Sequence, residues 1–222
     1  MIAHDMRTPL TALGLSVHAA RASASDPEAV RACLEVAERN VAALSQLVEA
    51  VVDTASGGGG KLQFRECVPR DLITNAIDQI APTASQKRIR VESESEQDLP
   101  VFVADGNRLV RVLVNLLSNA VRFSPEGGSV RVSVKARAND GHESIVFSVS
   151  DSGPGVKRED IDRIFVSGVS IAKGGKYSSG LGLTVCKEIV EAHGGRIWVD
   201  TAVAHGAAFS FSIPLTIQPP KA

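Results

Sequence analysis

Two asparagines one helical turn apart are the first residues in this sequence whose spacing suggests chemistry. Asn115 and Asn119 lie in the segment 107–123, where apolar residues recur with the period of a helix. Side chains four residues apart share a helix face, so the two amide oxygens can together bind a hard cation such as magnesium. Arg122 follows on the same face and suits a phosphate. Taken alone, these residues are explained more simply as an ordinary solvated helix face.

One glycine-rich segment follows a predicted strand, and another precedes a predicted helix. Asp151 comes directly after an apolar run, and Gly153 and Gly155 permit a tight turn close to a flat ligand. The Asp151 carboxylate can accept a hydrogen bond from an exocyclic amine. The segment 174–183 precedes a predicted helix, where free backbone N–H groups can bind phosphate. It matches neither GxxxxGK[ST] nor GxGxxG, and an ordinary turn accounts for either segment alone.

A histidine near the start of the chain lies on the polar side of a heptad pattern. Met6 and Leu10 belong to the apolar stripe, which places His4 outward, on the same face as Thr8. A solvent-facing imidazole is a possible nucleophile toward phosphorus. An unremarkable surface histidine is the better explanation for any such residue by itself.

These residues need elements to position them, and the first 54 residues predict two helices. The segment Asp26-Pro27-Glu28 ends one helix and starts another, with Asp26 as the N-cap. Such a hairpin leaves a wide apolar stripe uncovered, so we expect two hairpins to pair as a homodimeric four-helix bundle. Packing of the hairpin on its own chain is the alternative. The stripe comprises Ala3, Met6, Leu10, Leu13, Val17, Ala20 and Ala24, then Val30, Leu34, Ala37, Val41, Leu44, Val48 and Val51.

After a glycine-rich joint at residues 56–60, helix and strand patterns alternate, which predicts an α+β fold. Residues 139–141 read as a turn between two strands, and we expect an antiparallel or mixed sheet covered by helices on one face. Helices are expected at 70–86, 107–123, 157–164 and 180–193. Strands are expected near 89–94, 101–104, 129–137, 144–150, 196–202 and 207–215.

The composition is that of a globular protein and excludes several classes of function. The 222 residues carry a net charge of -1, which gives no basic surface for nucleic acid. The sequence contains no run of 18 apolar residues, so we expect no membrane contact within this chain. We also find no secretory signal pattern at its start. Three cysteines without a CxxC pair fit a reducing environment. We therefore expect a cytoplasmic chain, although the full-length protein could be membrane-anchored upstream.

The order of these motifs resembles that of the sensor histidine kinases of two-component systems. HDMRTPL at 4–10 resembles their phosphoacceptor box, and NRLVRVLVNLLSNAVRFSPEGG at 107–128 resembles their asparagine box. DSGPG at 151–155 is similar to the first glycine box, RIF at 163–165 to the start of the phenylalanine box. SGLGLTVCKEIVEAHGGRIWV at 179–199 is similar to the second glycine box. The resemblance covers residues 1–215.

This resemblance implies a domain organisation and a role for the first helix. Residues 1–56 would form a dimerisation and histidine-phosphotransfer hairpin, and residues 61–217 an ATP-binding domain of the kind shared with gyrase and some chaperones. That domain would be an α/β sandwich with a mixed, largely antiparallel sheet. His4 would be the phosphoacceptor, Asp5 its acid/base partner, and Thr8 would orient water when the protein dephosphorylates its partner.

The resemblance also implies a nucleotide site for ATP with Mg²⁺. Asn115 and Asn119 would hold Mg²⁺, Arg122 would lie near the phosphates, and Phe123 would pack near the base. Asp151 would read the adenine amine, with Gly153 and Gly155 giving the adenine room. Gly180, Leu181 and Gly182 would border the phosphates, and residues 156–179 would form a mobile lid.

The implied activity is autophosphorylation of His4 by ATP, followed by transfer to an aspartate on the receiver domain of a response regulator. Three alternatives stay open: a non-catalytic nucleotide-binding scaffold, a histidine-kinase-like protein that acts chiefly as a phosphatase, and a plain dimerisation module. The sequence departs from the family pattern at several places. Arg122 stands where lysine is common, and the predicted first helix begins only three residues before His4. Phe165 is followed by Val166-Ser167-Gly168-Val169 rather than by a second aromatic, and the residues at 205–209 replace the usual glycine–threonine pattern.

Overall fold

The computed structural model describes residues 2–37, 40–41, 44, 62–139, 142–161, 163–166, 182–200 and 206–215, without the side chains of residues 2–8, 139 and 142. The chain divides into two compact units, with Met1–Gly60 in the first and Lys61–Val166 and Leu183–Ala222 in the second. No helix in the described part of the chain is long and apolar enough to span a bilayer.

The first unit contains the two helices that the heptad pattern predicts. Helix α1 runs over Ile2–Ala22, and a second helix begins at residue 27 and continues through residue 37. The Asp26 carboxylate accepts hydrogen bonds from the backbone N–H groups of Glu28 (3.1 Å) and Ala29 (3.2 Å). The predicted N-cap is therefore confirmed, because these groups have no partner inside the helix. Residues 45–51 of the predicted stripe lie outside the described residues.

Part of the apolar stripe of this hairpin is exposed to solvent in the single chain. Leu10 is 53% exposed and Leu34 is 52% exposed, and Val17 and Val41 are exposed to a similar degree. Burial of such side chains stabilises a protein by about 25 cal/mol for each Å² of apolar area removed from water. A face of this kind gains stability when another apolar surface covers it.

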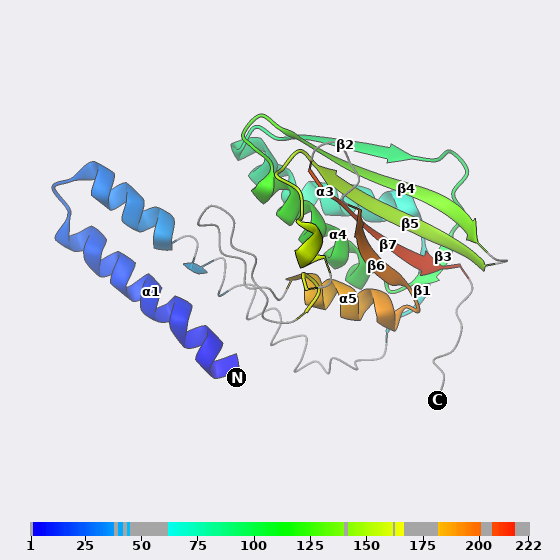
Figure 1. Cartoon of the computed structure of the whole chain (residues 1–222), viewed down its shortest axis with the longest axis horizontal. Helices are drawn as coiled ribbons and strands as arrows, with labels where there is room; N and C mark the ends of the chain where they lie inside the picture. Colours follow the sequence, from blue (N-terminus) through cyan, green and yellow to red (C-terminus); the bar gives the residue numbers. More distant parts are fainter. Residues whose placement is uncertain are drawn as a thin grey trace. The chain divides into compact units, whose positions relative to one another are not determined.

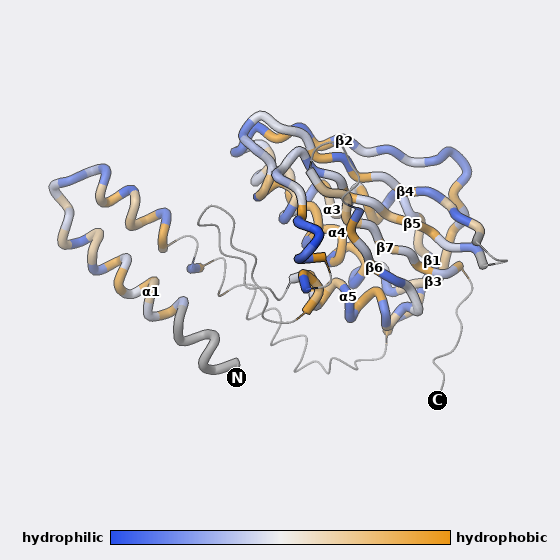
Figure 2. Tube along the Cα trace, viewed as in Figure 1, coloured by the Kyte–Doolittle hydropathy of each residue, from blue (hydrophilic) through white to orange (hydrophobic). Residues whose placement is uncertain are grey.

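The second unit is built on a mixed five-stranded sheet with the strand order β2-β4-β5-β7-β6. Strand β2 pairs with β4 in parallel, and every other pair is antiparallel. The strands are β2 (Arg90–Ser95), β4 (Ser129–Asn139), β5 (His142–Asp151), β6 (Arg196–Asp200) and β7 (Ala208–Pro214). The mixed, largely antiparallel sheet is therefore confirmed. Figure 2 shows that the edge strand β2 is hydrophilic along much of its length, which protects an edge from pairing with another chain.

Three helices cover one face of this sheet, as Figure 1 shows: α3 (Pro69–Gln86), α4 (Gly106–Phe123) and α5 (Gly182–Ala192). Successive side chains of each strand point to opposite faces of the sheet, so every second side chain packs with these helices in a single core. The Phe147 and Phe211 rings stack at its centre, with centroids 4.9 Å apart. The expected helix-covered sheet is thus confirmed.

Two parts of the second unit differ from the sequence-based expectation. Strand β1 (Arg65–Cys67), which was not predicted, pairs with β3 (Phe102–Ala104) in a separate two-stranded sheet. Its three residues are too few to show a period. The predicted helix at 157–164 is wrong, because the chain forms only a 3-10 turn, η1 (Arg158–Asp160), followed by further turns. So short a segment is a marginal helix by itself, and Ile164 is its one buried side chain among the described residues.

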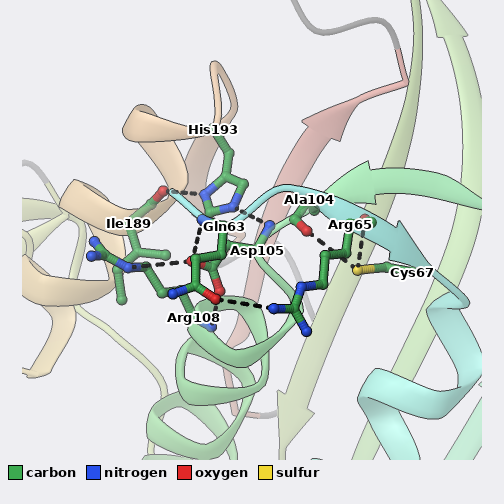
Figure 3. A network of polar contacts seen from close by, with 8 residues as sticks. All are labelled: Gln63, Arg65, Cys67, Ala104, Asp105, Arg108, Ile189 and His193. Carbon is green, nitrogen blue, oxygen red and sulfur yellow. Dashed lines mark hydrogen bonds and ion pairs between the residues drawn. The ribbon is translucent and has the colours of Figure 1, made fainter. Parts of the chain in front are cut away.

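A buried polar network joins the start of the second unit to two of its helices (Figure 3). The imidazole Nε2 of His193 accepts the backbone N–H of Asp105 (3.0 Å), and its Nδ1 lies 2.8 Å from the Ile189 carbonyl oxygen. The Asp105 carboxylate caps α4 through the Arg108 N–H, and it also accepts the backbone N–H of Gln63 (3.0 Å). His193 therefore carries its proton on Nδ1 and fastens the end of α5 to the start of α4.

This arrangement predicts that stability falls as the pH is lowered. Burial lowers the pKa of His193, so the unfolded chain binds a proton more readily than the folded one. Its stabilising effect is complete above about pH 6.5 and is lost as the pH falls below that value, by at most about 1.4 kcal/mol per pH unit. Urea unfolding between pH 7.5 and 5, followed by the fluorescence of Trp198, measures this slope.

The variant His193→Gln should have a weaker pH dependence than the natural chain, at a lower overall stability. Equal slopes for the natural chain and His193→Gln would contradict the assignment.

Candidate functional site

The polar face of α4 holds the predicted cation and phosphate ligands. Asn115, Asn119 and Arg122 are each partly buried on this face. The Nη2 of Arg122 donates to the Asn119 side-chain oxygen at 3.0 Å, and its guanidinium lies 4.6 Å from the centroid of the Phe123 ring. Burial lowers the pKa of Arg122 because it disfavours the charged form. An anionic group beside this guanidinium would offset that cost.

The opposite face of α4 determines which way these side chains point. Seven residues of this helix are buried against the sheet and the neighbouring helices, which fixes the rotation of α4 about its axis. They are Leu109, Val112, Leu113, Leu116, Leu117, Ala120 and Val121.

The middle of α4 also contacts α5 through Cys186. Its Sγ lies 3.9 Å from the Val112 carbonyl oxygen, and the thiol interacts with the Asn115 side chain. Complete burial raises the pKa of Cys186 to about 12, so this thiol stays protonated and unreactive. Asn115 therefore has a neutral partner beneath it.

Asp151 lies at the end of β5, where the chain turns sharply. Its Oδ1 accepts the backbone N–H of Gly153 at 2.8 Å, and its own backbone N–H donates to the Ala207 carbonyl oxygen at 3.0 Å. Burial raises the pKa of this carboxyl group, although the hydrogen bond from Gly153 partly opposes the effect. A partly buried acceptor of this kind suits a neutral donor such as an amine.

Glycines bring the Asp151 turn against the end of α4. A Cβ on Gly153 would lie 3.0 Å from the Phe123 carbonyl oxygen, so the absence of a side chain permits this approach. Gly155, with φ +71°, would place a Cβ 2.7 Å from the carbonyl oxygen of Gly206. These two glycines are thus required by close backbone packing, and the expected room for adenine is a separate role that stays a prediction.

The same turn depends on a glycine that sequence analysis missed. Gly206 has φ +79°, and a Cβ there would lie only 1.7 Å from the Asp151 carbonyl oxygen. The glycine–threonine pattern of the family is altered around it. The signal that could have revealed it is its position immediately before the apolar alternation of the last strand.

The phenylalanine-box residue packs within the second unit. The Phe165 ring meets Phe209 of β7 edge-on, with centroids 6.5 Å apart, and the Phe165 carbonyl oxygen accepts the Thr184 hydroxyl at 3.5 Å. Val166, which follows it, is 53% exposed.

The structure therefore brings together one part of the predicted site. Asn119, Arg122 and Phe123 are linked to one another, and the Phe123 carbonyl oxygen meets the turn that carries Asp151. Gly182 is the first residue of α5. Gly180, Leu181 and residues 167–179 of the predicted lid lie outside the described residues. So do the side chains of His4, Asp5 and Thr8, whose backbone belongs to α1.

Both units match known protein families. Residues 1–60 match the model of the His Kinase A (phospho-acceptor) domain. Residues 104–217 match the model of the histidine kinase-, DNA gyrase B-, and HSP90-like ATPase.

Curated relatives share the order of both regions. The adaptive-response sensory kinases SasA of Synechococcus sp. strain JA-2-3B'a(2-13) and strain CC9311 are 31% and 33% identical to this chain, over 97% of its length. The chain spans 58% and 55% of the length of these relatives.

Solved structures of similar fold are histidine kinases. ThkA, solved in complex with the response regulator protein TrrA, matches with a TM-score of 0.73 and 25% identity, over 97% of this chain and 60% of ThkA. Full-length ShkA, solved in complex with AMPPNP, matches with a TM-score of 0.67 and 28% identity, over 98% of this chain and 46% of ShkA. The motifs, the fold and these matches agree, and the chain belongs to the sensor histidine kinases, of which it carries the catalytic core.

Proposed function

We propose that this chain binds ATP with Mg²⁺, phosphorylates its own His4 and passes the phosphoryl group to an aspartate on a response regulator. The observation that carries the proposal is the junction of α4 with the Asp151 turn. There a half-buried guanidinium, amide oxygens and a half-buried carboxyl group lie on adjoining backbone. Residues 1–56 would supply the phosphotransfer hairpin and residues 61–217 the ATP-binding domain.

The residues at this junction fit a magnesium nucleotide. Asn115 and Asn119 would hold Mg²⁺ through their amide oxygens, which are ligands that this ion accepts alongside phosphates and water. Bound Mg²⁺ neutralises charge on the phosphates. Arg122 would lie near the phosphates, and Asp151 would accept the adenine amine. Gly180, Leu181 and Gly182 would border the phosphates, and the AMPPNP complex of ShkA supports a nucleotide in this domain.

The remaining residues would carry out a phosphoryl transfer in which positioning does most of the work. A neutral imidazole nitrogen of His4 attacks the γ-phosphorus, so that an N–P bond forms while the bond to the bridging oxygen breaks and ADP leaves. Asp5 takes the imidazole proton. Thr8 would orient a water molecule when the protein instead removes the phosphoryl group from its partner.

The partners proposed are a second copy of the chain and a receiver domain. The exposed stripe at Leu10, Val17, Leu34 and Val41 supports pairing of two hairpins as a four-helix bundle. The likeness to ThkA, which was solved with TrrA, supports a response regulator as the acceptor. We place this chemistry in the cytoplasm.

The identity of the phosphoacceptor can be tested with Mg-ATP labelled at the γ-phosphate. The natural chain should acquire label that is stable to alkali and labile to acid, and His4→Gln should acquire none. His18, an exposed histidine on the same helix, is the matched control, and His18→Gln should be labelled normally.

Each other result points to a different conclusion. Label that persists in His4→Gln would refute His4 as the acceptor. ATP binding without any label in the natural chain would favour the scaffold or the phosphatase.

The role of Asn115 predicts a loss of chemistry without loss of assembly. Asn115→Ala should lower the single-turnover rate of autophosphorylation by about 100-fold or more, as the removal of one preorganised polar group does in other enzymes. Light scattering should still show a dimer, because the substitution lies outside the hairpin. Asn107→Ala, at an exposed position at the start of α4, is the control. A monomeric variant or full activity would contradict the assignment.

The role of Asp151 predicts a preference for bases that carry an exocyclic amine. Calorimetry should show that Asp151→Ala weakens ATP binding by about tenfold or more, because a partly buried hydrogen-bond partner is lost. The natural chain should bind ATP more tightly than inosine triphosphate, which has a carbonyl group in place of the amine. The variant should lose this preference.

A control variant separates recognition of the base by Asp151 from a general effect of removing a carboxylate. Asp98→Ala, at an exposed turn, should keep both the affinity and the preference. Unchanged discrimination in Asp151→Ala would show that this carboxylate does not read the base.

A further inference from the structure

A lysine from α3 binds the end of the helix that carries the candidate site. Lys87 is the C-cap residue of α3, and its side chain is partly buried. Its Nζ donates to the carbonyl oxygens of Val121 and Arg122, each at 2.8 Å, and to that of Ser124. One ammonium group thus joins three carbonyl oxygens at the C-terminal end of α4.

These three carbonyl groups are a natural target for a cation. The last carbonyls of a helix have no partner inside it, and the helix dipole makes this end negative. An ammonium group has three N–H donors, and hydrogen bonds to an ionised donor are stronger than those between neutral groups. Lys87 therefore acts as a cap for α4 that another helix supplies.

Backbone groups at and near Lys87 also bind the loop that connects α4 to β4. The N–H of Gly127 donates to the Lys87 carbonyl oxygen at 3.4 Å, and the N–H of Arg90 donates to the Gly128 carbonyl oxygen at 3.0 Å. Arg88 pairs with Glu126 at 3.3 Å. The turn at the end of α3 thus supports the whole connection from α4 to β4.

The residues fixed in this way are those of the candidate nucleotide site. Arg122, whose carbonyl oxygen binds Lys87, holds the Asn119 oxygen through its guanidinium. Phe123 lies between two of the bound carbonyls, and its own carbonyl oxygen meets Gly153 in the Asp151 turn. A shift at the end of α4 would therefore move the predicted phosphate, base and amine contacts together.

We propose that Lys87 is a positioning residue for nucleotide binding, acting through the backbone of Val121, Arg122 and Ser124. This inference rests on the proposed function, because it assigns Lys87 to the same ATP site. Its role is to hold the end of α4 in position against the Asp151 turn before the nucleotide binds. Sequence analysis missed it because nothing local relates a lysine after one helix to the end of another.

The test compares Lys87→Met with Lys87→Arg and with Lys135→Met, a control at an exposed position of β4. Calorimetry with Mg-AMPPNP should show a dissociation constant raised about tenfold in Lys87→Met. Lys87→Arg keeps the charge and should stay within about threefold of the natural chain. Lys135→Met should bind as the natural chain does. Trp198 fluorescence confirms that each variant is folded at the temperature used.

Kinetics distinguish positioning from a general loss of structure. In Lys87→Met the KM for ATP should rise while the rate at saturating ATP changes little. Partial unfolding would instead lower the rate at an unchanged KM, and that result would overturn the inference. If Lys87→Met does not fold, Lys87→Gln, which keeps an amide donor, should show the same rise in KM.

The two proposals fail in different ways. Equal affinity for Mg-AMPPNP in the natural chain and folded Lys87→Met would overturn the role of Lys87 alone. No binding by the natural chain would overturn the proposed function, and the role of Lys87 with it.

Discussion

The packing of α4 against the sheet is the constraint on which the rest of the second unit depends. One face of this helix is buried along its length, so the helix can neither rotate nor slide without exposing apolar surface. The direction in which its polar face points is thereby fixed. Both ends are held by residues from other elements, with Asp105 and His193 at the start and Lys87 at the end. A site built on such a helix is preorganised, because its side chains need not be ordered when a ligand binds.

The junction with the Asp151 turn shows how close packing and polar chemistry are combined. Glycines at 153, 155 and 206 allow three stretches of backbone to approach one another, and each would be blocked by a single added carbon. The approach leaves one carboxyl group partly buried beside a backbone N–H, and one guanidinium partly buried beside an amide. Desolvation disfavours the charged form of both groups.

What could be predicted from the sequence was what repeats locally. The periods of 107–123 and of the last strand arise from burial of one face, so they fixed the type and nearly the bounds of α4 and β7. The cap at Asp26 was readable for the same reason. The roles of Gly206, His193 and Lys87 depend on partners 34 to 88 residues away or on another segment of backbone, and no local pattern records such partners. The helix predicted at 157–164 failed because apolar spacing over two turns does not supply enough burial.

The state of the cysteines has a practical consequence for studying motion in this kinase. Cys67 and Cys186 are buried and have raised pKa values, whereas Cys33 lies partly exposed on the second helix of the hairpin. Thiol-reactive dyes therefore favour the hairpin over the second unit. The chain's one tryptophan, Trp198, lies on β6 of the second unit. The natural sequence thus already contains a donor and an attachment point for an acceptor, one in each unit, for energy-transfer measurements with and without nucleotide.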